Sequence, residues 1–267
     1  MGKNNIKKTF SKKLKNNFQE SISPDKLISS VIKSPGFKVD REAFLREEFR
    51  DLPQEAIETI IRTGAVEAGI SREELRRRAT EILNNRISSS QTPQESDSKH
   101  EKENNLSAEI ICFYSLALKS AQEISYLYGE RDLWKRSSVD SGEVKNQLML
   151  YCAVMLGATG AAKAVKVFAA SLAKEARKKM LTKILYYPLV KVASKVTGKD
   201  VTIKSISQSV SQSIPAAGEF VSEGITLAAL LPMGNRLIDT LDKAHFDYSE
   251  EEFENDIKEI TEENKNP

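Results

Sequence analysis

Two glutamates four residues apart are the residues of this sequence whose type and spacing best suit catalysis. Glu219 and Glu223 lie in an apolar stretch bounded by Pro215 and Pro232. Residues at i and i+4 share one helix face, and two close carboxylates have one pKa raised, as general acid–base catalysis requires. The pair also has a structural interpretation, because Glu219 would favour the helix dipole in the first turn and both could pair with lysines. The sequence leaves both interpretations open.

Other residues able to do chemistry are few. The chain has two histidines, His100 and His245, and two cysteines, Cys112 and Cys152. Their positions match no metal-binding, nucleophilic or glycine-rich phosphate-binding motif, so we expect no metal and no cofactor. His245 is predicted to be a packed or surface histidine. Two isolated cysteines without a CxxC motif are typical of small buried hydrophobic residues in a reducing cytoplasm.

Helical periodicity runs through nearly all of the 267 residues and predicts an all-α bundle. No run alternates strictly enough to predict a strand. Helix starts are indicated by Asp40 and by two capping boxes, Ser71–Glu74 and Ser249–Glu252. Between Glu143 and Lys179 we expect one long helix or two, because Gly157 and Gly160 form a weak point. Another helix is expected from Pro215 to Pro232.

Composition divides the chain into five segments. The stretch 87–105 has one apolar residue and no periodicity, which predicts a disordered internal linker. Residues 130–143 are expected to form a charged loop. The predicted segments are a basic flexible tail (1–22), a small N-terminal helical module (23–86), the linker (87–105), a helical core (106–248), and an acidic C-terminal helix and tail (249–267).

Charge is strongly segregated although the formal net charge is only +2. Residues 163–204 carry eleven Lys/Arg against two acids, and residues 239–265 carry eleven acids against three lysines. This asymmetry predicts an electrostatic partner, either the acidic end of the chain itself or an external one. Few aromatic residues and the low net charge disfavour nucleic acid. Arg76, Arg77 and Arg78 are spread by helical geometry over about 200° and are predicted to form a solvated face.

The basic middle segment is also a candidate for membrane contact. Aromatic residues beside lysines suit a membrane interface, whereas a helix covered by lysines with buried stems is the structural alternative. The sequence favours neither interpretation over the other. The residues concerned are Lys174, Arg177, Lys178, Lys179, Lys183, Tyr186 and Tyr187.

Two apolar stretches, 146–162 and 214–231, raise the question of membrane insertion. In the second, two central acids cost about 5–7 kcal/mol, and seven large apolar residues return only about 2–4 kcal/mol, so it should not insert alone. We therefore expect two buried helices of a soluble bundle rather than a membrane hairpin. Small residues would let these helices pack closely, namely Gly157, Gly160, Gly218 and Ser222.

Several phrases occur in an order that resembles the bacterial EcsC family. They are SPGFKVDREAFLREEF (34–49), the phrase Val66–Ser71, Tyr126–Gly129, the helix Leu148–Lys174, Tyr187–Lys191, and the segment from Ile214-Pro215 to Leu231-Pro232-Met233. The resemblance implies an all-helical, membrane-associated protein without established catalytic residues. Members of that family are glycine-rich where this chain has Glu219 and Glu223. They carry an apolar segment where this chain has the polar stretch 87–105.

These observations predict a non-enzymatic accessory or interaction protein at the cytoplasmic face of a membrane. Its partner would be an anionic membrane surface or a membrane protein, and it would bind anionic lipid, a hydrophobic ligand or a partner helix. Two alternatives stay open. One is a membrane-perturbing effector that inserts its two apolar helices, and the other is an enzyme that uses Glu219 and Glu223. The sequence leaves the oligomeric state open.

Overall fold

The computed structural model describes residues 24–90, 105–135, 142–173 and 222–263. In these ranges the chain is helical with no strand, which confirms the predicted all-α class. The helices are α2 (Pro24–Ile32), α3 (Arg41–Glu48), α4 (Gln54–Thr63), α5 (Arg72–Ser90), α6 (Asn105–Leu127), α7 (Gly142–Met155), α8 (Thr159–Ala173), α12 (Ser222–Phe246) and α13 (Glu250–Glu263). The expected basic tail (1–22) and most of the expected linker (91–104) lie outside the described residues.

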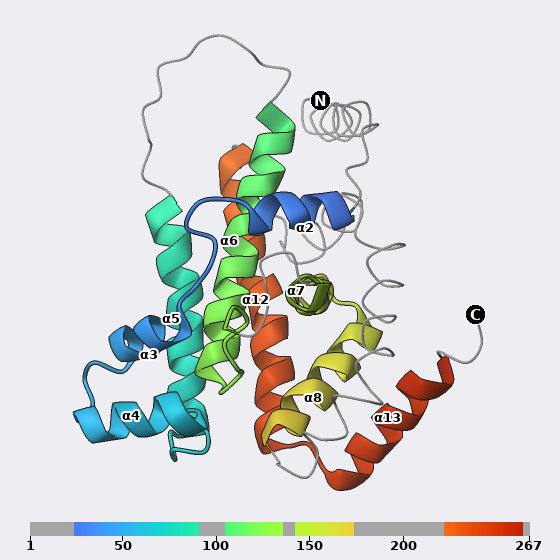
Figure 1. Ribbon diagram of the computed structural model, residues 1–267. Coiled ribbons are helices and arrows are strands. Elements are labelled where there is room, and N and C mark those ends of the chain that lie inside the picture. The colour runs from blue at the N-terminus through green and yellow to red at the C-terminus, as the bar shows by residue number, and fades with distance from the viewer. Residues whose placement is uncertain (1–23, 91–104, 136–141, 174–221, 264–267) are drawn as a thin grey trace, which may run out of the picture.

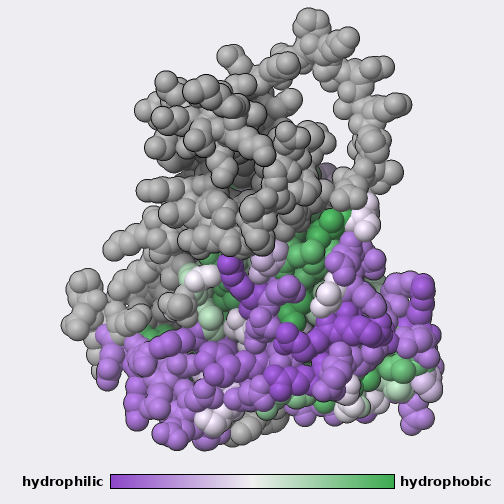
Figure 2. All heavy atoms as spheres, turned by 180° about the vertical axis from the view of Figure 1, so that it is seen from behind, coloured by the Kyte–Doolittle hydropathy of each residue, from purple (hydrophilic) through white to green (hydrophobic). Residues whose placement is uncertain are grey.

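Helix α12 is the centre of the described packing (Figure 1). It contacts α5, α6, α7 and α8, while α2 lies against α6 and α7, and α13 lies against α8. The core is built from large side chains that are almost fully buried, among them Tyr114, Tyr126, Tyr128 and Tyr151. Polar residues cover most of the described surface in Figure 2, and apolar residues show as a band near the middle of the view and in smaller groups near its lower edge.

The expected helix end at Pro232 is wrong, because α12 continues through this proline to Phe246. A proline inside a helix removes one backbone hydrogen bond and costs about 3 kcal/mol. Buried residues on both sides of it, including Leu230, Met233 and Leu237, pack into the core and offset this cost. Gly234, two residues after Pro232, lets α5 approach closely, since an added Cβ would clash with a methyl carbon of Leu83.

Local capping signals were accurate predictors of helix starts. Asp40 accepts a hydrogen bond from the Ala43 amide at 2.9 Å and caps α3. At α13 both halves of the capping box form, with distances of 3.1 and 3.2 Å between Ser249 and Glu252. At α5 only half forms: the Glu74 amide donates to Ser71, and the Glu74 carboxylate instead binds two arginines.

One helix boundary differs from the expectation, and another decides between the two expected arrangements. Helix α5 extends to Ser90, four residues into the stretch expected to be linker. The region after residue 142 forms two helices, and α7 ends before Gly157, which has a φ of +87°. That backbone conformation favours glycine and ends the helix. Among the described helices, none is both long enough and apolar enough to cross a membrane.

The two cysteines differ in accessibility, so the expectation that both are buried is wrong for one of them. Cys112 is exposed and Cys152 is buried, and burial raises the pKa of the Cys152 thiol to about 12. We expect one thiol to react rapidly with a disulfide reagent in the native protein, because the thiolate is the reactive form. The second thiol should react only after unfolding. Counting labelled thiols by mass spectrometry tests this, and rapid labelling that persists in Cys112→Ser would contradict it.

Candidate functional site

The residues predicted to form sites fall mostly outside the described ranges. This applies to Lys174, Arg177, Lys178, Lys179, Lys183, Tyr186, Tyr187, Gly218 and Glu219. Ser222 and Glu223 begin α12, and their side chains are not described. Gly160 lies in the first turn of α8, whereas Gly157 lies in the exposed turn before it rather than on a helix face. The Arg236 guanidinium lies beside this turn and donates to the Met155 carbonyl oxygen at 2.9 Å.

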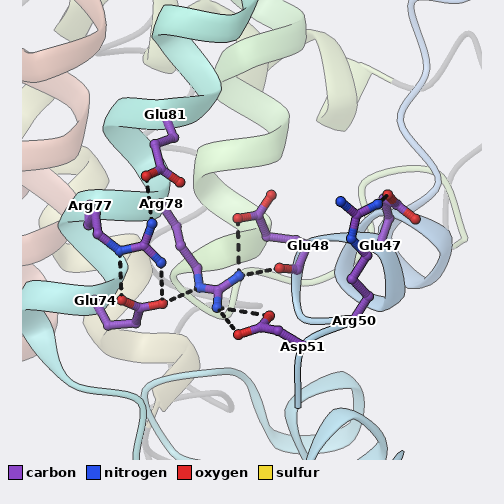
Figure 3. A network of polar contacts seen from close by, with 8 residues as sticks. All are labelled: Glu47, Glu48, Arg50, Asp51, Glu74, Arg77, Arg78 and Glu81. Carbon is purple, nitrogen blue, oxygen red and sulfur yellow. Dashed lines mark hydrogen bonds and ion pairs between the residues drawn. The ribbon is translucent and has the colours of Figure 1, made fainter.

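The expectation that Arg76, Arg77 and Arg78 form a solvated face is wrong for Arg78, whereas Arg77 is exposed and Arg76 is half-exposed, each with an ion pair. Arg78 is only 6% exposed, and its guanidinium contacts the carboxylates of Glu74, Asp51 and Glu48 (Figure 3). It also donates to the Glu48 carbonyl oxygen and lies 4.6 Å from the centre of the Phe49 ring. This network ties α5 to the end of α3.

A second set of arginine contacts ties α5 to α12. Asp242 is buried on α12 and forms ion pairs with Arg72 at 2.7 Å and with Arg76 at 3.1 Å. The Tyr128 hydroxyl donates to the same carboxylate at 3.3 Å. Arg76 also pairs with Asp239, and Arg72 also pairs with Asp247. Asp242 therefore serves as a structural counter-ion shared by two arginines.

The acidic helix α13 lies against the beginning of the basic segment. Asp256 pairs with Lys166 at 2.9 Å, and both Asp256 and Glu259 pair with Lys163. The prediction that the acidic end folds against the basic middle is thus confirmed for the two lysines of α8. Residues 174–204 lie outside the described ranges.

A cavity of about 420 Å³ opens where the turn after α4 meets the turn after α6. Its wall includes Gly64, Val66, Tyr128 and Gly129, and its exposed residues include Arg62 and Glu67. The two turns approach through backbone atoms, since a Cβ added at Gly64 would lie 3.0 Å from the Gly129 Cα. Thr63, Glu130, Ala169 of α8 and His245 of α12 also line it. Two phrases singled out in the sequence, Val66–Ser71 and Tyr126–Gly129, thus contribute to one cavity.

Glu130 is the most unusual residue of this cavity. It was expected in a charged loop, but it is 1% exposed, and neither carboxyl oxygen has a hydrogen-bond partner among the described residues. Its backbone is held by Arg41, whose guanidinium donates to the Glu130 and Ile61 carbonyl oxygens, both at 2.8 Å. Burial raises the pKa of Glu130 to about 8, although the charges of Arg131 and Arg41 lower it. The carboxyl group is therefore largely neutral at pH 7.

His245 is half-buried, and its Nε2 atom is shielded from solvent. Its Nε2 atom has no hydrogen-bond partner within the described part of the chain, and its ring centre lies 6.0 Å from that of Tyr128. Burial lowers the pKa of His245 to about 4, and the charge of Asp242 opposes this shift. The imidazole is therefore neutral at pH 7. The sequence left a packed or a surface position open; the ring packs beside Tyr128, and its place at a cavity could not be predicted from the sequence.

Glu130 and His245 line this cavity, but their unpaired polar atoms are shielded from solvent. A protonated carboxyl group offers one donor and one acceptor, and a neutral imidazole offers a lone pair. Within the described ranges no group of three His, Cys, Asp or Glu side chains could hold a metal ion. Comparison of this chain with family models, with curated proteins and with solved structures finds no match.

Proposed function

We propose that this protein is a non-enzymatic accessory protein that binds an anionic membrane surface through its basic segment 174–204. The observation that carries the proposal is that five of the C-terminal acids form ion pairs with residues outside this segment. Asp239, Asp242 and Asp247 pair with α5 arginines, and Asp256 and Glu259 pair with the first two lysines of the basic region. The segment 174–204 then still has nine Lys/Arg against two acids, a net charge of +7. Such a segment is attracted to the anionic cytoplasmic leaflet.

Peripheral binding fits the packing better than insertion of the apolar helices. Every residue from Leu148 to Met155 of α7 is at most 7% exposed and lies in the protein core. Inserting this helix into a bilayer would first remove it from those contacts. Attraction of lysines to lipid requires no such unfolding, and each lysine near the surface contributes about 1 kcal/mol.

Vesicle flotation tests this proposal. The protein should float with phosphatidylcholine vesicles only when they also contain phosphatidylserine, and high salt should release it because surface charges are screened. Replacing Lys178 and Lys179 together with alanine should weaken binding by about 2 kcal/mol, or roughly 30-fold.

The matched control replaces two exposed lysines elsewhere, Lys135 and Lys258. This double variant should bind nearly as well as the native protein. The proposal is wrong if no flotation depends on phosphatidylserine at low salt, or if the control loses as much binding as the test variant.

A further inference from the structure

We propose that α13 is an autoinhibitory helix, which covers Lys163 and Lys166 of α8 and must leave them before they bind an anionic membrane. The inference rests on the proposed membrane binding of segment 174–204 and names its regulation. The two lysines are three residues apart and share one face of α8. The residue after this helix is Lys174, which begins the basic segment. The two lysines are therefore the next cations along the chain that a membrane bound to this segment would contact.

Carboxylates of α13 pair with both lysines. The helix packs against α8 (Figure 1). Asp256 forms an ion pair with Lys166 at 2.9 Å, and Glu259 pairs with Lys163. The Lys166 side chain is only 14% exposed, compared with 38% for Lys163. While α13 is in place, the Lys166 side chain is thus largely shielded from lipid headgroups.

Tyr248, in the turn between α12 and α13, adds to the cover over Lys166. Its hydroxyl donates to Asp256 at 2.7 Å, and the Lys166 ammonium lies 4.6 Å from the centre of its ring. The same ring packs edge-on against Phe253 of α13. Lys166 therefore contacts a carboxylate and an aromatic face, and both belong to the segment that would have to move.

The composition of α13 suits its displacement by an anionic surface. The helix has only three apolar residues, of which Phe253 and Ile260 are buried and Ile257 is half-buried. It carries eight acids against one lysine, so an anionic membrane repels it. Lipid phosphates and carboxylates can replace Asp256 and Glu259 as partners of the two lysines. An anionic membrane therefore both repels α13 and substitutes for its ion pairs.

Hydrogen exchange of the native protein tests the displacement without any substitution. On vesicles of phosphatidylcholine and phosphatidylserine, the backbone amides of α13 should exchange at least about fivefold faster, because the lost contacts raise the population of open states. The reference is the same protein with vesicles of phosphatidylcholine alone. If the protein binds the anionic vesicles and the exchange of α13 is unchanged, the inference is overturned and the proposed membrane binding stands.

Two matched double variants separate these ion pairs from the overall charge of α13. Asp256→Asn with Glu259→Gln removes the two acids that pair with α8. Glu251→Gln with Glu254→Gln removes two exposed acids that form no ion pair within the described part of the chain. In titrations with the anionic vesicles, the first variant should bind about five- to thirtyfold more tightly than the second, since each released lysine adds about fivefold. Equal affinities would contradict the inference.

The gain in affinity should depend on the two lysines. Lys163→Gln and Lys166→Gln, added to the Asp256→Asn and Glu259→Gln variant, should return its affinity to within about threefold of the native protein. A gain that persists without these lysines would rule the inference out. If neither the native protein nor any variant binds the anionic vesicles, the proposed function is wrong and the inference fails with it. Circular dichroism identifies any variant that does not fold, and the exchange measurement on the native protein does not depend on the variants.

Discussion

Replacing Glu130 with glutamine should stabilise the protein by an amount that grows as the pH rises from about 5 to about 8. Burial raises the pKa of this carboxyl group from 4.5 to about 8 in the folded protein. In the unfolded chain it titrates near its ordinary value. Between these two pH values the unfolded chain has lost the proton and the folded protein still holds it.

The sign of the effect follows from proton linkage. Below about pH 4.5 the carboxyl group is mostly protonated in both states, so its titration hardly changes the free energy of unfolding. As the pH rises, unfolding releases a proton, so the free energy of unfolding of the native protein falls. The loss reaches about 3 kcal/mol at pH 7 and about 4 kcal/mol at pH 8, and it levels off near about 5 kcal/mol above pH 9 because the folded state also ionises. Glutamine is neutral in both states and avoids this loss.

The measurement is urea unfolding of the native protein and of Glu130→Gln at several pH values. The quantity to follow is the difference between their free energies of unfolding, because the titration of His245 and of other groups is common to both and cancels. A fixed offset from the changed hydrogen bonding does not affect the slope. Glu67→Gln, a change at an exposed residue of the same cavity, is the control and should stay within about 0.5 kcal/mol of the native protein. A difference for Glu130→Gln that is flat from pH 5 to pH 8 would show that this carboxyl group is ionised in the folded protein.

Replacing Arg78 with alanine should destabilise the fold by about 3–5 kcal/mol, which is typical of removing one partner from a buried ionic network. The guanidinium is the only group in Figure 3 that contacts Glu48, Asp51 and Glu74 together. Without it these carboxylates lose their shared counter-ion. Glu48 is the most affected, because burial already raises its pKa and Arg78 is the charge that lowers it.

Arg77→Ala is the matched control for this substitution. Arg77 is the neighbouring residue on the same helix and pairs with Glu74 and Glu81, but half of its side chain is exposed. An exposed pair of this kind contributes little to stability, because solvent screens it. Thermal unfolding followed by circular dichroism should show a decrease in Tm on the order of 10 °C for Arg78→Ala and only a few degrees for Arg77→Ala. Similar decreases for the two variants would mean that burial of Arg78 adds nothing to the stability.

Arg78→Lys would show which property of the side chain matters. Lysine keeps the positive charge but lacks the planar fork that binds both oxygens of Asp51 at 2.9 and 3.0 Å. A loss between those of the alanine variant and the control would assign part of the stability to geometry. A loss equal to that of alanine would assign nearly all of it to the guanidinium shape.

The sequence alone determined the features of this protein that depend on neighbouring residues. Helical periodicity identified the all-α class, because the spacing of apolar residues is set by the helix itself. Asp40 and Ser249 marked helix starts, since a cap needs only the next turn of the chain. Gly157 marked the break between α7 and α8 for the same local reason.

Only the tertiary structure decided the features that depend on distant contacts. Pro232 remains inside a helix because the residues around it are buried against four other helices. Arg78 and Glu130 have charged side chains that are usually exposed, and each is buried by segments far away in the sequence. The cavity likewise joins residues near positions 64, 130 and 245. No local sequence pattern predicts these contacts between distant residues, because they result from how the helices pack and not from the helical propensity of any one segment.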